Sequence, residues 1–155
     1  FLEIIWKEKS YNFILKNKDE LLILASIIQK ESGDIDDSKL VASVFINRLE
    51  NKMKLQSDVT LAYGFNVNGK KITKKMLKSN NPYNTYKYYG LPPGIISMPS
   101  IQAIDAVLNY EKHNYYFFAA DPTNPGYHSF ARSLSEHKRN ARKFHNYLNS
   151  KGIKK

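Results

Sequence analysis

Residues 21–33 read Leu-Leu-Ile-Leu-Ala-Ser-Ile-Ile-Gln-Lys-Glu-Ser-Gly, and this stretch decides the fold. Only Ser26 interrupts its apolar first part, so a helix formed here is apolar on nearly every side and must be buried. Just upstream, Asn17 with Glu20 has the pattern of a capping box, and Asp19 is an alternative N-cap. The sequence therefore predicts a core helix around which the rest of the chain is arranged.

One carboxylate, Glu31, lies at the end of this predicted helix, because Gly33 stands where a helix would stop. A carboxylate in the last turn is close to the negative end of the helix dipole, which raises its pKa. A raised pKa suits a general acid. The alternative is a solvated surface glutamate beside Lys30, and these residues alone leave both interpretations open.

The composition indicates one folded domain. The chain has 155 residues, of which 42% are hydrophobic, and its longest apolar run is far shorter than the ~20 residues that cross a membrane. Cysteine is absent from the sequence, which excludes disulfides, thiolate catalysis and cysteine-based zinc sites. No signal peptide is visible and the chain begins at Phe1, so we expect an excised piece of a longer protein.

The net charge is +10, and most of it lies at the carboxyl end. A basic tail can contact nucleic acid, anionic lipid or an acidic polymer. The plainer interpretation is the solvated face of a terminal helix, and since no nucleic-acid motif accompanies the tail, we expect no nucleic-acid partner. Seven basic residues follow Glu136, the last acidic residue: Lys138, Arg139, Arg142, Lys143, Lys151, Lys154 and Lys155.

Three further long helices are predicted after the core helix. An acidic loop at residues 34–38 precedes a second helix that runs to about Asn51. Ser97 or Ser100 caps a third helix, and Ser133 begins a terminal helix through a second capping box.

Strand patterns lie between these helices. Residues 59–67 are aromatic and β-branched and are followed by Asn68-Gly69, which is a strong hairpin signal, while Thr73 caps a short helix. Residues 115–120 predict a buried strand, and residues 127–130 alternate as its partner. The predicted fold class is therefore α+β, with several helices packed with a small antiparallel sheet in a single domain.

A long irregular stretch, residues 79–99, is the least ordinary part of the chain. Loops of this length in a compact domain are usually functional. Residues 83–86 supply tyrosine and asparagine without charge, and residues 90–94 read Gly-Leu-Pro-Pro-Gly. Flat apolar faces with hydrogen-bonding edges suit sugars, although such a loop can equally pack on its own domain.

Several chemistries are excluded by their missing patterns. The sequence has no phosphate-binding glycine loop, no nucleophile elbow, and no histidine and glutamate spacing of a metalloprotease, so we expect no metal. The carboxylates are scattered, and their spacing assigns no glycosidase pair. They are Glu31, Asp58, Asp105 and Asp121.

Taken together, these segments resemble the catalytic domain of the endolytic murein transglycosylases, the YceG-like or MltG-type lytic enzymes. The resemblance runs from about Leu21 to His137, and the loop formed by residues 83–86 and 90–94 is its most specific element. Val59 departs from the family pattern, in which proline is usual after the aspartate. The remaining matching segments are residues 25–31, 41–49, 53–58, 63–64, 117–119, 128–130 and 136–137, with Pro99.

The resemblance implies cleavage of the β-1,4 bond between N-acetylmuramic acid and N-acetylglucosamine inside peptidoglycan strands. The muramyl 6-hydroxyl, not water, attacks C1 and leaves a 1,6-anhydro end. One carboxyl group is enough, first as acid and then as base. Glu31 matches the catalytic glutamate of the family, and no cofactor is implied.

The resemblance also implies a substrate groove, with residues 84, 86 and 91–94 opposite Glu31. We expect Asp58 to place the substrate and not to act as a nucleophile. The implied substrate-binding residues are Gln56, Asp58, Tyr63, Asn84, Thr85, Tyr86, Leu91, Pro92, Pro93, Gly94 and His128.

For the whole protein the resemblance implies a membrane anchor and a LysM-like module before residues 19–150, the catalytic domain. Residues 1–18 would be a connecting helix, and residues 151–155 a basic tail. Action in the periplasm or extracytoplasmic space is implied, with glycan strands as substrate and peptidoglycan synthases as candidate partners. The alternatives are a hydrolytic muramidase that uses Asp58 as second carboxylate, or a non-catalytic peptidoglycan- or nucleic-acid-binding module.

Overall fold

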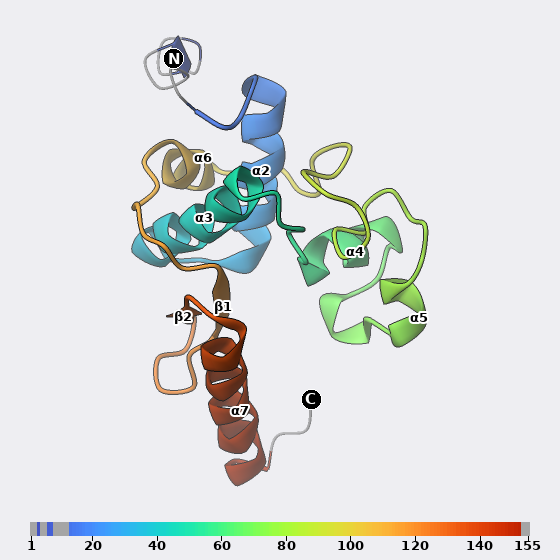
Figure 1. The fold of residues 1–155 in the computed structure, drawn as a ribbon, viewed down its shortest axis with the longest axis vertical. Helices are drawn as coiled ribbons and strands as arrows, with labels where there is room; N and C mark the ends of the chain where they lie inside the picture. Colours follow the sequence, from blue (N-terminus) through green and yellow to red (C-terminus); the bar gives the residue numbers. More distant parts are fainter. Residues whose placement is uncertain (1–2, 4–5, 8–12, 153–155) are drawn as a thin grey trace.

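The computed structural model describes residues 3, 6–7 and 13–152, and its α+β architecture confirms the predicted fold class (Figure 1). The described part of the chain combines helices with a single two-stranded antiparallel sheet. The elements are α2 (Lys18–Glu31), α3 (Ile35–Glu50), α4 (Asp58–Gly64), the 3₁₀ turn η1 (Gly69–Lys71), α5 (Lys74–Leu77), α6 (Ile101–Leu108), β1 (Phe117–Ala120), β2 (His128–Ala131) and α7 (Leu134–Ser150).

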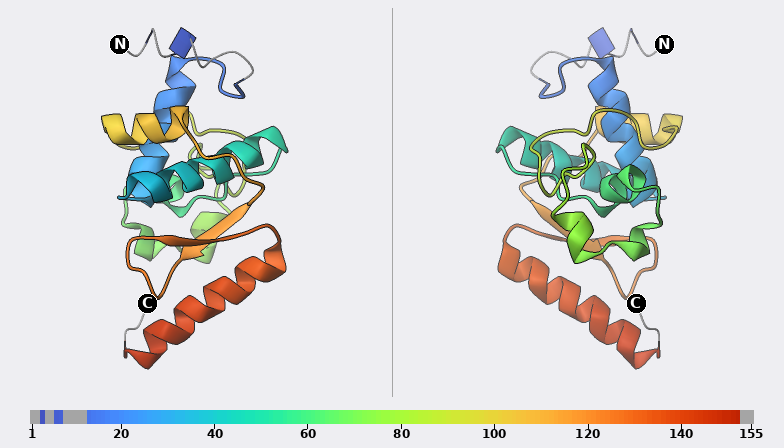
Figure 2. Two further views of the ribbon diagram at one scale, coloured as in Figure 1. Left: turned by 90° about the vertical axis from the view of Figure 1, so that its left-hand side faces the viewer. Right: turned by 90° about the vertical axis from the view of Figure 1, so that its right-hand side faces the viewer.

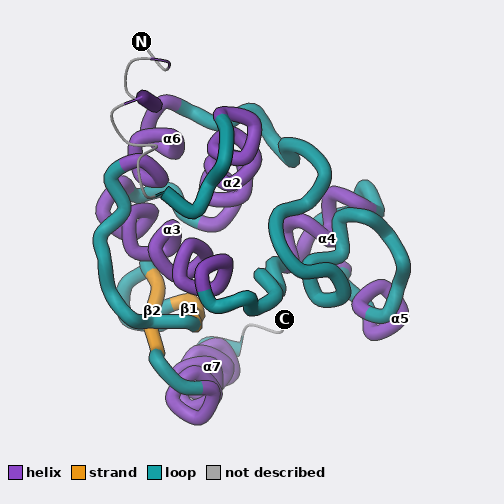
Figure 3. Tube along the Cα trace, turned by 45° about the horizontal axis from the view of Figure 1, so that its top comes forward, coloured by secondary structure: helices purple, strands orange, loops and turns teal. Residues whose placement is uncertain are grey.

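Helix α2 forms the centre of the core, as its sequence predicts. It packs against α3 and α6, while α4 lies on the other side of it from α6 (Figures 1 and 3). The N-terminus is capped by Asn17, whose Oδ1 accepts from the Glu20 amide at 2.9 Å, so the cap is Asn17 and not Asp19. Burial of the apolar face of this helix stabilises the domain. Its fully buried apolar residues are Leu21, Leu24, Ala25, Ile27 and Ile28.

Ser26, the one polar residue of the apolar run, is fully buried and connects α2 to the long loop. Its hydroxyl donates to the Ile23 carbonyl at 2.6 Å and accepts from the Ile96 amide at 3.1 Å. Its carbonyl accepts from the Ser97 hydroxyl at 2.9 Å. A buried hydroxyl must be satisfied, and Ser26 is satisfied by attaching the end of the loop to the core.

The two strands form a hairpin that lies between α3 and α7 (Figures 1 and 3). Residue 117 pairs with residue 131, and residue 120 with residue 128. Figure 2 shows from two sides that α7 runs beyond this hairpin. No described residue of α7 is buried, which fits the prediction of a terminal helix with a solvated basic face.

The prediction of a strand over residues 59–67 with a hairpin at Asn68-Gly69 is wrong, because this segment forms α4 and η1. Leu61 is fully buried, and the buried Thr60 hydroxyl lies 2.8 Å from the Ser57 carbonyl and 2.9 Å from the Thr85 hydroxyl. Asn66 then adopts a left-handed φ of 52°, which ends the helix. Tertiary packing of Thr60 and Leu61 therefore overrides the β-propensity of the segment.

The predicted helix over residues 1–16 falls largely on residues outside the described ones. Residues 13–17 are not helical, and α2 begins at Lys18, so the predicted helix does not reach the core helix. Trp6 and Phe13 pack against the core. At the other end, the predicted tail is described only at residues 151–152, which form a turn. None of the helices in the described part of the chain has the length and hydrophobicity that spanning a bilayer requires.

Asn84 stabilises the long loop from inside. Its side chain is fully buried, and Nδ2 donates to the carbonyls of Leu77 at 3.0 Å and Ser79 at 2.9 Å, while Oδ1 accepts from the Tyr86 amide at 3.0 Å. We expect Asn84→Ala to lower the free energy of unfolding by about 2 kcal/mol, because it leaves these buried groups unpaired. Urea unfolding measures this loss. The exposed Asn80→Ala is the control, and equal midpoints for the two variants would contradict the prediction.

Candidate functional site

A cleft of about 1020 Å³ brings together segments far apart in the sequence. One wall consists of the end of α2, residues 55–59 and Tyr86. The other consists of residues 116–120 of the hairpin, His128 and the inner side of α7. Glu31 therefore lies on a cleft large enough for several sugar rings.

Glu31 is the last residue of α2, and its Oε1 accepts a hydrogen bond from the Ser57 hydroxyl at 3.1 Å. Burial raises the pKa of Glu31 to about 7, and the charge of Asp58 adds to this effect, whereas the Ser57 hydrogen bond and the charge of His128 oppose it. A carboxyl group with this pKa can both donate and accept a proton at neutral pH. The structure thus supports the interpretation of Glu31 as an acid and base over that of a solvated surface charge.

The Ser57 hydroxyl is placed by hydrogen bonds between its own segment and the long loop. Thr85 is buried; its hydroxyl accepts from the Ser57 amide at 2.9 Å, and its carbonyl accepts from the Gln56 amide at 3.1 Å. Gln56 has a left-handed φ of 51°, a conformation that is uncommon for residues other than glycine. Strained backbone of this kind is often found at functional sites, where the surrounding structure holds it in place.

Asp58 and Tyr86 form a second polar pair on the same wall of the cleft. The Tyr86 hydroxyl donates to Asp58 Oδ1 at 2.5 Å. Burial raises the pKa of Tyr86 well above its usual value, and the hydrogen bond to Asp58 raises it further. Tyr86 therefore remains a neutral donor, and its ring presents an apolar face to the cleft.

His128 lies on the opposite wall and is held by Asp37 of α3. His128 Nδ1 is 2.7 Å from Asp37 Oδ2, and the His128 amide donates to Asp37 Oδ1 at 3.0 Å. The Ser32 hydroxyl also donates to Asp37 Oδ2, at 2.6 Å. Burial alone would raise the pKa of Asp37, but the bonds from His128 and Ser32 hold it below its usual value, so the carboxylate is ionised.

Arg48 joins the two walls. It is buried, with Nε donating to the Tyr116 carbonyl and Nη1 to the Lys54 carbonyl, both at 2.7 Å. Its guanidinium lies 4.9 Å from the centre of the Phe117 ring. Since Tyr116 precedes β1 and Lys54 precedes the Gln56–Asp58 segment, Arg48 fixes the distance across the cleft.

A profile of the YceG-like family matches residues 3–143. The chain belongs to the YceG-like family. The crystal structure of a YceG-like protein from Listeria monocytogenes has a TM-score of 0.76 to this structure at 38% identity, over 88% of this chain and 43% of that one. The resemblance stated from the sequence is thereby confirmed at the level of the family.

Curated relatives of this YceG-like chain carry a functional name. An endolytic murein transglycosylase from Streptococcus pneumoniae is 36% identical over 150 residues, which cover 91% of this chain and 26% of that protein. An endolytic murein transglycosylase from Bacillus subtilis is 37% identical over 142 residues, which cover 90% of this chain and 38% of that protein. The chain therefore spans less than half the length of these relatives.

Four of the predicted substrate-binding residues of this YceG-like domain lie on the cleft beside Glu31. Three of them share its wall, while the fourth faces them from the hairpin. They are Gln56, Asp58, Tyr86 and His128.

Two predicted residues, Asn84 and Thr85, are buried and bonded within the protein, so they do not line the cleft. Both instead hold the loop that carries Tyr86 and the Ser57 segment. The amide of Asn84 satisfies backbone carbonyls that a long loop leaves unpaired, which is why a residue of sugar-binding type lies inside. Their contribution to the site is therefore through the backbone they position.

The remaining predicted residues also lie away from the cleft. Tyr63 is 48% exposed and packs its ring edge against Tyr83 at 4.9 Å. Leu91 packs on the core, Pro92 is buried, Pro93 is exposed, and Gly94 lies against Tyr83. Residues 91–94 are not among the residues that line this cleft, so their place in a glycan groove opposite Glu31 stays a prediction.

Three polar contributors were not predicted as site residues: Ser57, Asp37 and Arg48. Ser57 had a sequence signal, since it directly precedes Asp58 in the family motif. Asp37 had no such signal, because an aspartate in an acidic loop before a helix is ordinarily a capping residue. Its partner, His128, is 91 residues away in the sequence. Arg48 lies at helical spacing with apolar residues of α3, a pattern that predicts a helix and indicates none of the contacts of Arg48.

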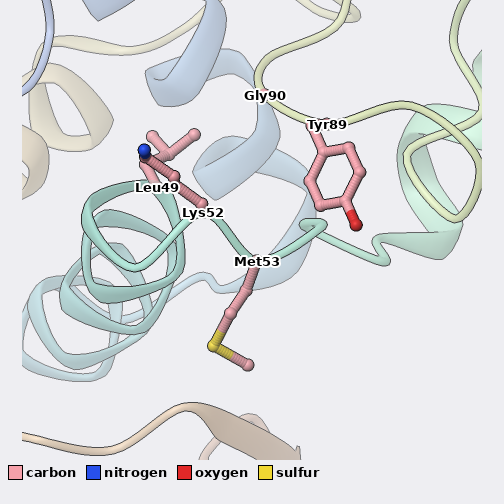
Figure 4. Close-up of a pocket in the computed structure, with 5 residues that line it drawn as sticks. All are labelled: Leu49, Lys52, Met53, Tyr89 and Gly90. Carbon is pink, nitrogen blue, oxygen red and sulfur yellow. The ribbon is translucent and has the colours of Figure 1, made fainter.

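A second, smaller pocket of about 520 Å³ lies between the end of α3 and the long loop (Figure 4). In Figure 4 the Tyr89 ring faces the region of Leu49 and Lys52 across it. Its lining residues include no carboxylate and no histidine, so it offers no acid–base group. Among the described residues, no cluster of three histidines, aspartates or glutamates could hold a metal ion.

Proposed function

We propose that this domain is an endolytic peptidoglycan transglycosylase, which cleaves the bond between N-acetylmuramic acid and N-acetylglucosamine within glycan strands and leaves 1,6-anhydro ends. The observation that carries the proposal is the carboxyl group of Glu31, whose pKa burial raises to about 7, on the wall of a large cleft. The names of its relatives from Streptococcus pneumoniae and Bacillus subtilis support the same activity.

In the proposed reaction, protonated Glu31 donates its proton to the glycosidic oxygen as the bond to C1 breaks. The muramyl 6-hydroxyl then attacks C1, and the Glu31 carboxylate takes the hydroxyl proton, so the enzyme returns to its starting state without consuming water. The Ser57 hydrogen bond stabilises the ionised form between the two steps, while burial favours the protonated form at the start. A pKa near neutrality serves both steps.

Asp58 and Tyr86 bind and orient the sugar in this proposal. Tyr86 offers a ring face for stacking, and its hydroxyl is engaged by Asp58. Asp58 retains acceptor capacity for a sugar hydroxyl or amide. It is not needed as a nucleophile, since the 6-hydroxyl performs the attack.

Mass spectrometry of glycan fragments tests the proposal. The domain is incubated with uncrosslinked glycan strands, and the expected products carry 1,6-anhydro ends. Reducing ends, or a trapped glycosyl–Asp58 adduct, would show a hydrolytic muramidase instead. Binding without product by both the wild type and Glu31→Gln would show a non-catalytic binding module.

We expect Tyr86→Ala to weaken glycan binding about 5- to 10-fold, because one stacked ring contributes on the order of 1 kcal/mol. Binding of strands by calorimetry, in proteins that carry Glu31→Gln to prevent turnover, measures the change. Tyr88→Ala is the matched control, since Tyr88 lies on the same loop and outside the cleft. Equal affinities for the two variants would remove Tyr86 from the binding site.

For the parent protein we propose action on the extracytoplasmic side of the membrane, with a membrane anchor and peptidoglycan synthases as partners. Residues 19–150 are the catalytic domain in this proposal. The basic face of α7 suits an anionic wall polymer better than nucleic acid, and such an attraction is screened by salt.

A further inference from the structure

The Asp37–His128 pair has a geometry that fixes which nitrogen of the imidazole carries a proton. Asp37 is 2% exposed and ionised, so both of its oxygens are acceptors. The contact between Asp37 Oδ2 and His128 Nδ1 at 2.7 Å therefore requires hydrogen on Nδ1. In a neutral ring Nε2 is then the unprotonated nitrogen.

Nε2 of His128 is open to the cleft. Within the described residues the His128 side chain makes its one hydrogen bond through Nδ1, and Nε2 is not a buried atom. His128 lines the cleft, whereas Asp37 lies behind it. The ring is also held by edge contacts with Phe118, at 5.1 Å between centroids, and with Phe130. The imidazole thus has little freedom to turn Nε2 away.

We propose that Asp37 is a positioning residue, which holds His128 with Nδ1 protonated so that Nε2 accepts a hydrogen bond from a hydroxyl or amide group of a glycan bound beside Glu31. The identity of the ligand rests on the proposed function, while the tautomer rests on the geometry of the pair and on the ionised state of Asp37. Ser32, next to Glu31 in the chain, donates to the same Asp37 oxygen and so links the end of α2 to the opposite wall.

Asp37→Asn tests the proposal because it replaces the carboxylate oxygen that accepts from His128 Nδ1 with an NH₂ group that can only donate. Its oxygen still accepts from the His128 amide, but its NH₂ group donates to Nδ1 and moves the ring proton to Nε2. Nε2 then becomes a donor. Asp34→Asn is the matched control, because it removes the same charge from the same helix end, and asparagine remains a good N-cap.

Two measurements are made. Long-range ¹H–¹⁵N spectra at pH 9, well above the ordinary imidazole range, report the tautomer. We expect an unprotonated Nε2 in the wild type and in Asp34→Asn, and the reverse in Asp37→Asn. Glycan affinity, measured in the Glu31→Gln background, should fall about 10-fold for Asp37→Asn and change less than 2-fold for Asp34→Asn. His128→Ala should show no larger loss than Asp37→Asn.

A protonated Nε2 in the wild type overturns the proposal, and so does an unchanged affinity in Asp37→Asn whose tautomer has reversed. Failure of the proposed function is a separate result. If glycan binds through His128 as described but no wild-type product forms, the transglycosylase proposal fails and the Asp37–His128 inference stands. If product forms but the tautomer has no effect on affinity, only the inference fails.

Discussion

Glu31→Gln is expected to lose about 10²-fold or more in the rate of product release while remaining folded and able to bind glycan. Glutamine keeps the size of the side chain and can still accept the hydrogen bond from Ser57, but it cannot transfer a proton. The measurement is the release of 1,6-anhydro fragments from uncrosslinked glycan by the two proteins. The effect falls on kcat, since the variant retains the groups that bind sugar.

Glu50→Gln is the matched control for this result. Glu50 is the last residue of α3, as Glu31 is of α2, but it is exposed and outside the cleft. We expect wild-type rates from it. Comparable rates for wild type and Glu31→Gln would remove Glu31 from the mechanism.

The second large expected effect is on the pH dependence of the free energy of unfolding. The pKa of Glu31 is raised from the ordinary 4.5 to about 7, so the folded state binds more protons than the unfolded state between these values. The raised pKa makes a favourable contribution to the free energy of unfolding, which is fully present below about pH 4.5 and is lost as the pH rises through about 7. The full shift in pKa corresponds to about 3 kcal/mol. Wild-type stability should therefore fall over this interval for this reason.

Glu31→Gln removes this dependence, so the variant should be more stable than wild type at pH 8, with a difference of up to about 3 kcal/mol that vanishes towards pH 4. Urea unfolding at both pH values measures it. Taking the difference between the proteins cancels the titration of the groups they share, apart from groups such as His128 whose charge acts on Glu31. If the two proteins differed in the free energy of unfolding by the same amount at pH 4 and at pH 8, a raised pKa for Glu31 would be contradicted. Greater stability of Glu31→Gln at pH 8 would show that the wild-type protein keeps the acid at a cost in stability.

Local sequence determined the elements whose signals are short-range. The apolar run of α2, its Asn17 cap and the Ser133 cap of α7 follow from side chains within four residues of each other, and the structure confirms them. The buried strand predicted over residues 115–120 and its alternating partner over residues 127–130 are likewise confirmed, with pairing at residues 117–120 and 128–131. Periodicity and capping are local properties, so a sequence displays them directly.

Tertiary structure decided what these local signals could not. Residues 59–67 have the composition of a strand, yet burial of Thr60 against Thr85 and of Leu61 in the interior makes them a helix. In the same way, Asn84 has the chemistry of a sugar ligand, but unpaired carbonyls in its own loop draw it inside. In the first example the partner, Thr85, is 25 residues away from Thr60, so a short stretch of sequence does not reveal it. In the second example the carbonyls that bind Asn84 come within reach only because of the path of the loop.

The candidate site likewise contains features that the sequence shows and contacts that only the fold creates. Glu31 at a helix end and the motif that holds Ser57 and Asp58 are visible in the sequence, and family resemblance directs attention to them. The Asp37–His128 contact spans 91 residues and the Ser57–Glu31 contact 26, so neither leaves a periodic or short-range trace. From the sequence came the candidate for proton transfer, Glu31 at the end of an apolar helix. Only the packing of α2 against the 55–59 segment and the hairpin decided its pKa and its neighbours, because desolvation and hydrogen bonding depend on the groups that the fold brings around it.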